Sequence, residues 1–307
     1  MQLIEVSRER PGWGYGSGVA RVCVIGSVNL DQSFAVARLP QPGETVLASS
    51  SSSSPGGKGG NQAVAAARAG ASVQLVAAMG DDAAASRLRS HLHDNDVGLD
   101  GTVTVPGPSG AAAIVVDATA ENVIVVAPGA NEHLSMASAA ARRVVSGAEV
   151  VLLQLEIPMA TVLAGARLAR DAGALVIVNA SPSGADPAAL AALAQVVDVV
   201  VVNDVEAAQW RWPVEHLVVT RGAAGARYQA GEISLDVPAP PVEAVDTTGA
   251  GDVFAGVLAA EWLSGPERAL RRACAAGALA TLTTGAGDCA PTAEAIDDVL
   301  DDDQGDP

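Results

Sequence analysis

Short apolar runs alternate along the chain with longer alanine-rich stretches. Six runs rich in valine, isoleucine and leucine have the length of buried strands, at residues 21–28, 72–77, 149–155, 174–179, 196–202 and 216–220. The stretches between them predict helices at 60–69, 82–93, 135–146, 158–172 and 187–195, and two more helices follow at 249–263 and 268–282. This alternation predicts repeated βαβ units around a parallel sheet.

Two stretches break the alternation. Residues 32–57 lack a helical period, and residues 102–127 contain three short strand candidates at 102–105, 111–116 and 122–127, separated by turn residues. We expect these segments to form a small antiparallel sheet outside the main one. The six serines from Ser49 to Ser54 fit a strand of that sheet, with a disordered linker as the alternative.

Composition narrows the function classes. Aromatic residues make up only 3% of the chain, so the core must be built from alanine, valine and leucine. The net charge of -17 argues against a general nucleic-acid or anionic-membrane surface, and an anionic substrate would need a local cradle. Part of this charge is a carboxyl-terminal run that predicts a solvated tail, formed by Asp297, Asp298, Asp301, Asp302, Asp303 and Asp306.

The cysteines and the first residues indicate where the protein works. Cys23, Cys274 and Cys289 are odd in number and lack Cys-x-x-Cys spacing, which indicates neither a disulfide framework nor a zinc site and predicts a reducing, cytoplasmic setting. Residues 1–20 lack the apolar run of a signal peptide, so we interpret them as a flexible amino-terminal extension. No segment approaches the roughly 18 apolar residues of a membrane span.

The first candidate motif runs from Pro55 to Gln62 and leads into an alanine-rich helix. Its glycines allow a ligand to approach the backbone closely. A nucleotide P-loop would need a glycine at position 52, which is serine, and a serine or threonine at position 59, which is glycine. The motif therefore predicts either a plain loop or a site in which Lys58 and Asn61 donate to a polar small molecule.

The second candidate motif runs from Asp246 to Asp252 and precedes an apolar helix. The amides of a first helical turn form a site for an anion such as a phosphate in transfer, and Asp252 there can take a proton from a hydroxyl nucleophile. The alternative is that Asp252 only caps the helix. The same tetrapeptide, Gly-Ala-Gly-Asp, also occurs at Gly285 to Asp288, but no long helix is predicted to follow it there. The tetrapeptide therefore indicates an anion site only where a helix follows it.

Polar side chains follow several predicted strands. Asn29 and Asp31 come just after the first strand and Glu156 just after the third, and ligands of open α/β sheets bind at such strand ends. We therefore expect these three to converge on one crevice. Asn203 and Glu206 follow a later strand with Asn-x-x-Glu spacing, which fits either a capping box or a role with metal and phosphate.

Together these motifs resemble the ribokinase-like carbohydrate kinase family. The likeness runs from Arg21 to about Leu300 and is most specific at Gly26–Asp31, Pro42–Val46, Gly56–Ala67, Glu121–Val123, Gly129–Asn131 and Asp246–Asp252. It implies an α/β three-layer sandwich with a mostly parallel central sheet and a small antiparallel β lid. On this basis residues 21–307 form the kinase domain, with lid segments at about 32–57 and 101–128 and a homodimer formed through the lid.

The resemblance also implies an activity and a role for individual residues. The expected reaction is ATP-dependent phosphorylation of D-ribose to ribose 5-phosphate, with Asp252 as the base and an anion hole of Gly249, Ala250 and Gly251. The residues expected to bind the sugar hydroxyls are Asn29, Asp31, Gly57, Lys58, Asn61, Glu156 and Asp252. The residues expected to bind ATP and Mg²⁺ are Asn203, Glu206, Thr220, Gly222 and Gly225. An activating K⁺ would lie near Asp246, Thr248, Gly285 and Cys289.

The sequence departs from the family pattern in two places, and two rival functions are open at this point. Cys289 stands near the cation site where the family has a serine, and the stretch before Gly285 is one residue shorter. The nearest rival is a kinase of the same family that acts on another sugar or a nucleoside, such as fructose, deoxyribose or adenosine. A second rival is a catalytically silent sugar-binding regulator, which would tolerate loss of the base or the anion hole.

Overall fold

A nine-stranded sheet forms the centre of the molecule. The structure, a computed structural model, describes residues 18–119 and 121–302. The sheet has the order β15-β14-β13-β12-β11-β10-β1-β4-β6, and the strands from β13 to β6 are parallel. Its strands are β1 (Arg21–Ile25), β4 (Ser72–Val76), β6 (Val97–Gly98), β10 (Val150–Leu153), β11 (Leu175–Asn179), β12 (Val199–Asn203), β13 (His216–Thr220), β14 (Ala226–Ala230) and β15 (Ile233–Val237).

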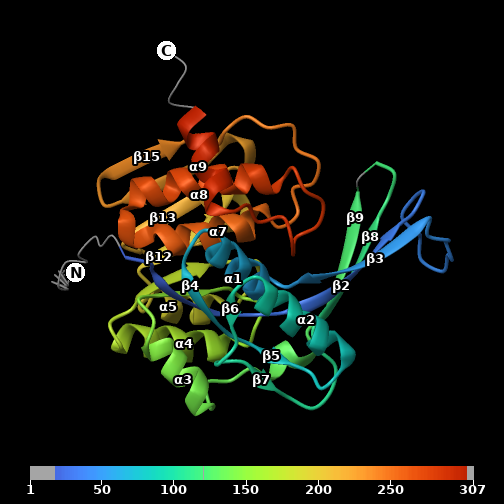
Figure 1. The fold of residues 1–307 in the computed structure, drawn as a ribbon, viewed down its shortest axis with the longest axis horizontal. Coiled ribbons are helices and arrows are strands. Elements are labelled where there is room, and N and C mark those ends of the chain that lie inside the picture. The colour runs from blue at the N-terminus through green and yellow to red at the C-terminus, as the bar shows by residue number, and fades with distance from the viewer. Residues whose placement is uncertain (1–17, 120, 303–307) are drawn as a thin grey trace.

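Helices cover both faces of this sheet and give the expected three-layer sandwich (Figure 1). One face carries α1 (Lys58–Arg68), α2 (Ala83–Asp94), α7 (Ala250–Glu261), α8 (Pro266–Ala280) and α9 (Ala293–Asp302). The other carries α3 (Ala139–Ser146), α4 (Met159–Asp171) and α5 (Pro187–Ala194). Strand residues alternate between the two cores, so Val24 lies in the core with α1 and α7 while Cys23 and Ile25 lie in the core with α3 and α4.

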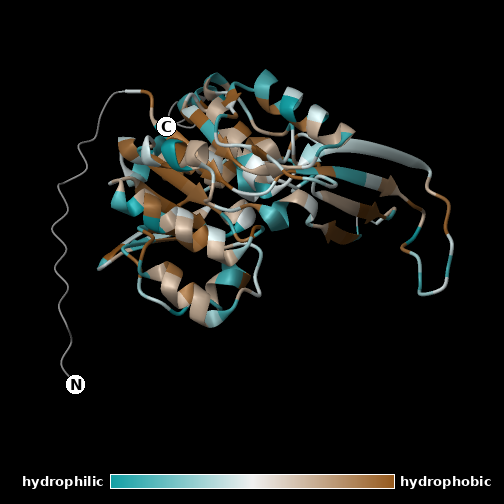
Figure 2. Cartoon of the chain, turned by 90° about the horizontal axis from the view of Figure 1, so that it is seen from below, coloured by the Kyte–Doolittle hydropathy of each residue, from teal (hydrophilic) through white to brown (hydrophobic). Residues whose placement is uncertain are grey.

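Alanine, valine and leucine build these cores, as the scarcity of aromatic residues predicts. Figure 2 shows the hydrophobic residues gathered on the central strands and on the inward sides of the helices. Small side chains let helices approach closely, and a Cβ placed on Gly256 of α7 would lie 2.8 Å from the Cβ of Ala65 on α1. Within the described ranges, none of the helices combines the length and hydropathy that a bilayer crossing requires.

The sequence did not predict the edge of the sheet formed by β14 and β15. These strands pair antiparallel with each other and with β13, around a tight turn at Gly231, whose φ is 57°. Along β14 only Ala226 and Tyr228 are buried, so the segment lacks the continuous apolar run of a central parallel strand.

A second, four-stranded sheet projects from the body of the molecule (Figure 1). This outer sheet has the order β3-β2-β8-β9 and consists of β2 (Asn29–Ala35), β3 (Ser50–Gly56), β8 (Ala111–Val116) and β9 (Asn122–Ala127). The run of serines is therefore a strand and not a linker. The β2–β3 and β8–β9 pairs are antiparallel as expected, but β2 and β8 pair in parallel, because both strands leave the body in the same direction.

The predicted strand at 102–105 does not belong to the outer sheet. Its central residues form β7 (Val103–Thr104), which pairs in parallel with β5 (Ala78–Met79) in a separate two-stranded sheet. Val103 and Val105 pack against the core on the α3 and α4 side, so this segment contributes to the body of the protein. The expectation that it forms part of the outer sheet is therefore wrong.

The acidic run at the carboxyl end is in part structural. Asp297 lies on α9 and pairs with Arg272 of α8, whose side chain is only 3% exposed and also pairs with Glu261 of α7. A buried guanidinium needs such partners, so the expectation of a solvated tail is wrong for Asp297. Asp303 and Asp306, like residues 1–17 of the predicted extension, lie outside the described residues.

Candidate active site

The first turn of α7 places a carboxylate beside the backbone amides that begin the helix. Gly249 is the cap residue, with a φ of 82°, a left-handed conformation that favours glycine, and no side chain caps the helix. Asp252 follows in the first turn and is 6% exposed. It does not act as the cap residue of this helix, so the capping interpretation of Asp252 is wrong. The helix dipole favours negative charge at this position.

Side chains from α1 hold both oxygens of that carboxylate. The Asn61 amide donates to Asp252 Oδ2 and the Gln62 amide to Oδ1, each over 3.0 Å. Lys58 Nζ lies 4.0 Å from Oδ1, and the Asp252 charge raises the pKa of this lysine. Hydrogen bonds to both oxygens fix the carboxylate in one orientation, with a cation beside it.

The turn that precedes α1 packs directly on the end of β1. Gly57 has a φ of 84°, and a Cβ there would lie 2.8 Å from the Asn29 amide nitrogen. Glu156 accepts from the Ser27 hydroxyl over 2.6 Å and from the Lys58 amide over 3.0 Å. The glycine turn, the β1 end and the β10 end therefore meet at one place. Of Asn29, Asp31 and Glu156, which the sequence predicts to converge, Asn29 and Glu156 line one cavity and Asp31 lies close enough for Glu156 to raise its pKa.

Asn29 is held by a residue to which the motifs assigned no role. Asn131 donates to Asn29 Oδ1 over 2.8 Å and accepts from the Val28 amide over 2.9 Å. Asn29 and Glu156 share a cavity of about 430 Å³ with Ser27, Asn131 and Glu132. Because amide and carboxylate groups line this cavity, it suits a ligand with several hydroxyl groups.

Asp31 is the carboxylate with an unmet hydrogen bond. Its Oδ1 is buried and lacks a partner among the described residues, while Gly56 leaves room for the group, since a Cβ there would lie 2.7 Å from Asp31 Cγ. Burial raises the pKa of Asp31 to about 6, the nearby Glu156 charge adds to this, and the Ala112 amide opposes it. An acceptor in this state is ready to receive a ligand hydroxyl.

A larger cavity of about 760 Å³ opens on the other side of the α7 start. Ala250 and Gly251 line it from α7, and Phe254, Cys274 and Ala278 give it an apolar wall. Asn203 from β12 and Thr220 from β13 also line it, together with Gly222 and Gly225 of the loop after β13. Gly225 has a φ of 83°, and a Cβ there would lie 2.7 Å from the Ala239 amide nitrogen.

Asn203 and Glu206 form a complete capping box on α6 (Asp204–Ala207). The Asn203 side chain accepts from the Glu206 amide over 2.8 Å, and the Glu206 carboxylate accepts from the Asn203 amide over 2.9 Å. Asn203 is exposed in the cavity, whereas Glu206 is buried behind it. The capping interpretation holds, and it leaves Asn203 and Asp204 at the cavity wall.

The residues predicted for a monovalent cation also come together. Asp246 accepts from the Thr248 amide over 2.9 Å and from the Gly285 amide over 2.8 Å. Burial acts to raise the pKa of Asp246, but these hydrogen bonds outweigh burial and lower the pKa. Cys289 Sγ lies 3.9 Å from the Thr248 carbonyl oxygen and 3.3 Å from that of Ala286, so two carbonyls converge beside the thiol.

Comparison with known proteins decides the class. The family model of the pfkB family carbohydrate kinases matches residues 19–293. The chain is 36% identical over 303 residues to a ribokinase of Bacillus subtilis (strain 168), which covers 91% of this chain and 99% of that protein. This chain belongs to the pfkB family of carbohydrate kinases. It is an ATP-dependent sugar kinase.

Solved structures agree on the fold of this kinase. A structure described as Arabidopsis thaliana ribokinase complexed with ribose and ATP matches with a TM-score of 0.85 and 28% identity, over 92% of this chain and 99% of that chain. A ribokinase structure from Thermotoga maritima matches with a TM-score of 0.83 and 29% identity, over 92% of this chain and 99% of that one. The ribokinase-like fold is therefore confirmed.

A deoxyribokinase of Salmonella typhi is also similar to this kinase. It is 30% identical over 306 residues, which cover 91% of this chain and 98% of that protein. The family is therefore settled, while the similarity extends to relatives named for two different sugars.

Three residues contact the predicted site residues although the sequence assigned them no role. Gln62 lies inside the glycine motif, yet its bond to Asp252 depends on how closely α1 and α7 pack. Asn131 lies inside the Gly129–Asn131 segment of the resemblance, and only the tertiary structure places it against Asn29. Ser27 lies inside the Gly26–Asp31 segment of the resemblance, but nothing in the sequence indicated its hydrogen bond to Glu156.

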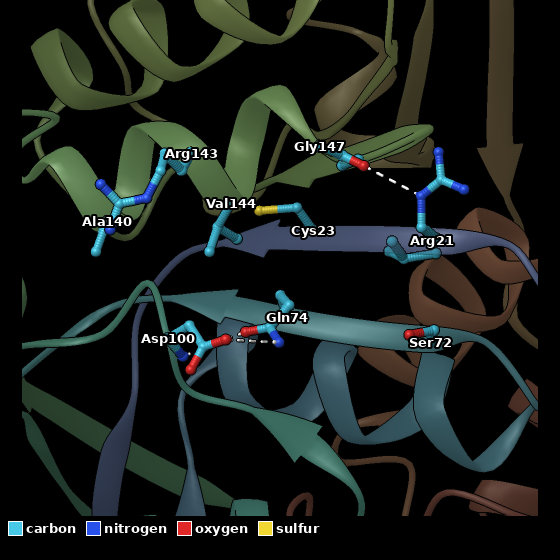
Figure 3. Close-up of a pocket in the computed structure, with 11 residues that line it drawn as sticks. Arg21, Cys23, Ser72, Gln74, Asp100, Ala140, Arg143, Val144 and Gly147 are labelled. Atoms are coloured by element: carbon cyan, nitrogen blue, oxygen red, sulfur yellow. Dashed lines mark hydrogen bonds between the residues drawn. The ribbon is translucent and has the colours of Figure 1, made fainter.

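Another cavity of about 570 Å³ lies away from all of these residues (Figure 3). Arg21 and Ser72, at the first residues of β1 and β4, line it together with Gln74, Asp100 and Arg143. Sugar and nucleotide sites of α/β sheets form at the carboxyl ends of strands, and this cavity lies toward the opposite ends. We therefore assign it no part in the kinase reaction.

The state of Asp31 predicts a pH-dependent gain in stability for Asp31→Asn. The pKa near 6 exceeds the ordinary value of 3.8, so the folded chain binds the Asp31 proton more tightly than the unfolded chain. Charging Asp31 therefore costs stability as pH rises through about 6. We expect the variant to gain roughly 2 kcal/mol over the wild type at about pH 8 and nothing below about pH 4.

Urea unfolding of the ligand-free enzyme at both pH values checks this expectation. Asp298→Asn is the matched control, because Asp298 is exposed on α9 and its substitution should change little at either pH. A gain that is equal at both pH values would show that burial of the Asp31 charge is not its cause.

Proposed function

We propose that this kinase phosphorylates D-ribose at the expense of ATP, with Asp252 as the general base. The observation that carries the proposal is the surroundings of Asp252. Its carboxylate contacts Lys58, Asn61 and Gln62 of α1, and the Lys58 backbone amide donates to Glu156, which lines the cavity of about 430 Å³. Ala250 and Gly251, just before Asp252, line the larger cavity of about 760 Å³. A sugar hydroxyl and a γ-phosphate can therefore meet at Asp252.

The reaction follows from the chain's own groups. Asp252 takes the proton of the sugar hydroxyl, whose oxygen forms a bond to the γ-phosphorus while the bond to the β–γ bridging oxygen breaks and ADP leaves. The amides of Gly249, Ala250 and Gly251 stabilise the charge that develops on the transferred group. The Lys58 ammonium, held beside Asp252, adds a positive charge at the same point.

Ribose is the sugar that the cavity and the relatives favour. Asn29 and Glu156 line the cavity of about 430 Å³, and Glu156 also accepts from the Lys58 backbone amide and lies near Asp31. Asn61 would reach the sugar beside Asp252, to which it donates, and Gly57 would let the sugar approach the backbone. Asp31 Oδ1 needs a donor that the protein does not supply among its described residues. A pentose with adjacent hydroxyls supplies such donors, and the ribokinase relatives named above support this choice.

Mg²⁺ and K⁺ fit the site in different ways. Among the described residues no group of three or more His, Cys, Asp or Glu side chains is placed to hold a metal ion. Mg²⁺ would therefore be held mainly by the ATP phosphates, with Asn203 and Glu206 reached through water, and it would neutralise phosphate charge. K⁺ would take the carbonyl oxygens that converge at Cys289, next to Asp246 and Thr248, and would hold the loop around Gly285.

We propose further that the lid predicted at about 32–57 and 101–128 is the outer sheet of β2, β3, β8 and β9, without residues 102–105, and that two copies associate through it. Four consecutive residues of its edge strand β9 are exposed hydrophobics, at 49% for Val123, 50% for Ile124, 63% for Val125 and 50% for Val126. An apolar edge strand of this kind is a template for pairing with another strand.

The three described cysteines are free and buried, in keeping with the reducing, cytoplasmic setting that we propose.

Asp252→Asn tests the base. Asparagine keeps the shape but cannot accept the proton, so we expect kcat to fall by roughly a hundred- to ten-thousand-fold while ATP binding changes little. Asp288→Asn is the matched control, because Asp288 ends the same Gly-Ala-Gly-Asp tetrapeptide but its side chain is 62% exposed. Near-normal turnover of Asp252→Asn in a coupled ADP-release assay would refute the role.

Sugar selectivity tests the substrate. If the polar cavity pairs every ribose hydroxyl, loss of the 2-hydroxyl leaves a buried group unpaired, and kcat/KM for 2-deoxyribose should be roughly ten- to a hundred-fold lower. Fructose and adenosine should be poorer substrates than ribose in the same ADP-release assay. A higher kcat/KM for any of the three would remove the ribose assignment and leave the kinase and the role of Asp252 in place.

Charge placed on β9 tests the dimer. Val125→Lys puts a like charge on each copy of an apolar edge, so sedimentation velocity should show the wild type as a dimer and the variant as a monomer. Ile233→Lys is the matched control, because Ile233 is 64% exposed on the edge strand β15 of the central sheet. A wild type that sediments as a monomer would contradict the proposal.

A further inference from the structure

Arg68 joins three segments that are distant in sequence. It ends α1, and its Nε donates to the Asn95 side chain at the end of α2 over 2.7 Å. Its Nη1 donates to two carbonyl oxygens of the loop before α9, that of Asp288 over 2.9 Å and that of Ala290 over 2.7 Å. The side chain is only 25% exposed, so these bonds form largely out of water.

The loop that Arg68 holds, residues 285–290, lies directly behind the start of α7. A Cβ on Gly249 would lie 2.8 Å from Ala286 Cα, so the cap residue of α7 and the loop are in contact. Gly285 donates to Asp246, and the Cys289 thiol lies against the Thr248 carbonyl. The position of the loop therefore sets the position of the turn that carries the anion-binding amides.

The same loop reaches the outer sheet. A Cβ on Gly287 would lie 2.9 Å from the Pro55 carbonyl carbon, near the end of β3. His91 on α2 approaches the loop as well, with Nδ1 3.6 Å from Asp288 Oδ1. The loop is thus packed between α2, α7 and β3, and Arg68 supplies its two hydrogen bonds to α1.

We propose that Arg68 is a positioning residue for phosphoryl transfer, which acts by fixing the 285–290 loop against the first turn of α7. The inference rests on the proposed role of that turn as the anion hole. A planar guanidinium donates to both carbonyls and to Asn95 at once, whereas a lysine ammonium on a flexible stem cannot reproduce this fork. Misplacement of catalytic amides by about 1 Å is enough to cost roughly a hundred-fold in rate.

Cys289 provides a measurement of the loop that does not depend on activity. The thiol is 4% exposed, and burial raises its pKa to about 11. Thiol reagents attack the thiolate, so Cys289 should react slowly while the loop is fixed and faster once it is released. Cys23 and Cys274 lie in the two cores, at 1% and 3% exposure, and serve as internal references.

The experiment compares Arg68→Lys and Arg68→Gln with the wild type. We expect the rate of Cys289 modification, followed by peptide mass spectrometry, to rise by roughly ten-fold or more in both variants. We also expect kcat to fall by roughly ten-fold or more with KM for ribose within about two-fold. In the wild type, replacing Na⁺ by K⁺ should slow Cys289 modification further.

Two controls separate positioning from general stability. Arg89→Lys removes a single hydrogen bond from α2 to the Thr104 side chain and should leave both measurements unchanged. Asp288→Asn removes the contacts of the exposed Asp288 carboxylate with Arg68 and His91 and should also leave them unchanged, because the bonds at issue go to carbonyls. Unchanged Cys289 reactivity and kcat in both Arg68 variants would overturn the inference.

The inference and the proposed function can fail separately. If the wild type does not phosphorylate ribose but Cys289 reacts faster in the Arg68 variants, the loop is held as described and the substrate assignment is wrong. If the wild type is active and the Arg68 variants lose only melting temperature, with kcat and Cys289 reactivity unchanged, Arg68 is a structural residue alone.

Discussion

The close approach of α1 and α7 is the constraint on which the active site depends. Gly256 has no side chain where α7 crosses α1, and Ala65 faces it there. Only at this separation can Asn61 and Gln62, on the first turns of α1, reach the carboxylate on the first turn of α7. A bulkier pair of helices would leave Asp252 buried without donors, which is costly for an ionised group.

This packing also divides the site into two halves. Polar groups from α1, β1 and β10 face one side of the α7 start, and the loop after β13 faces the other with an apolar wall behind it. In the proposed function the first half would bind the sugar, mostly through side chains with fixed partners, and the second half would bind the nucleotide through shape and backbone. Helix α7 would then contact both ligands.

The sequence predicted the strands and turns that depend on interactions between residues close together in the chain. The apolar runs predicted the parallel strands of the central sheet except the two-residue β6, and the glycine motifs predicted the two turns at which α1 and α7 begin. Features that depend on pairing between distant segments were not visible. The parallel pairing of β2 with β8, the antiparallel edge of β14 and β15 and the pairing of Asp297 with Arg272 are of this kind. Of the two side chains that donate to Asp252, the sequence assigned a role to Asn61 but not to Gln62.

The run of serines in β3 has a consequence for how the outer sheet keeps its register. Ser50 to Ser54 present the same side chain at every position, so a slip of β3 along β2 would exchange one serine for another at little cost. The register of β3 is therefore set at the end of the strand, where Gly56 packs against the Asp31 carboxyl group. Asp31, which we propose as a ligand of the sugar, thus also aligns β3 beside β2.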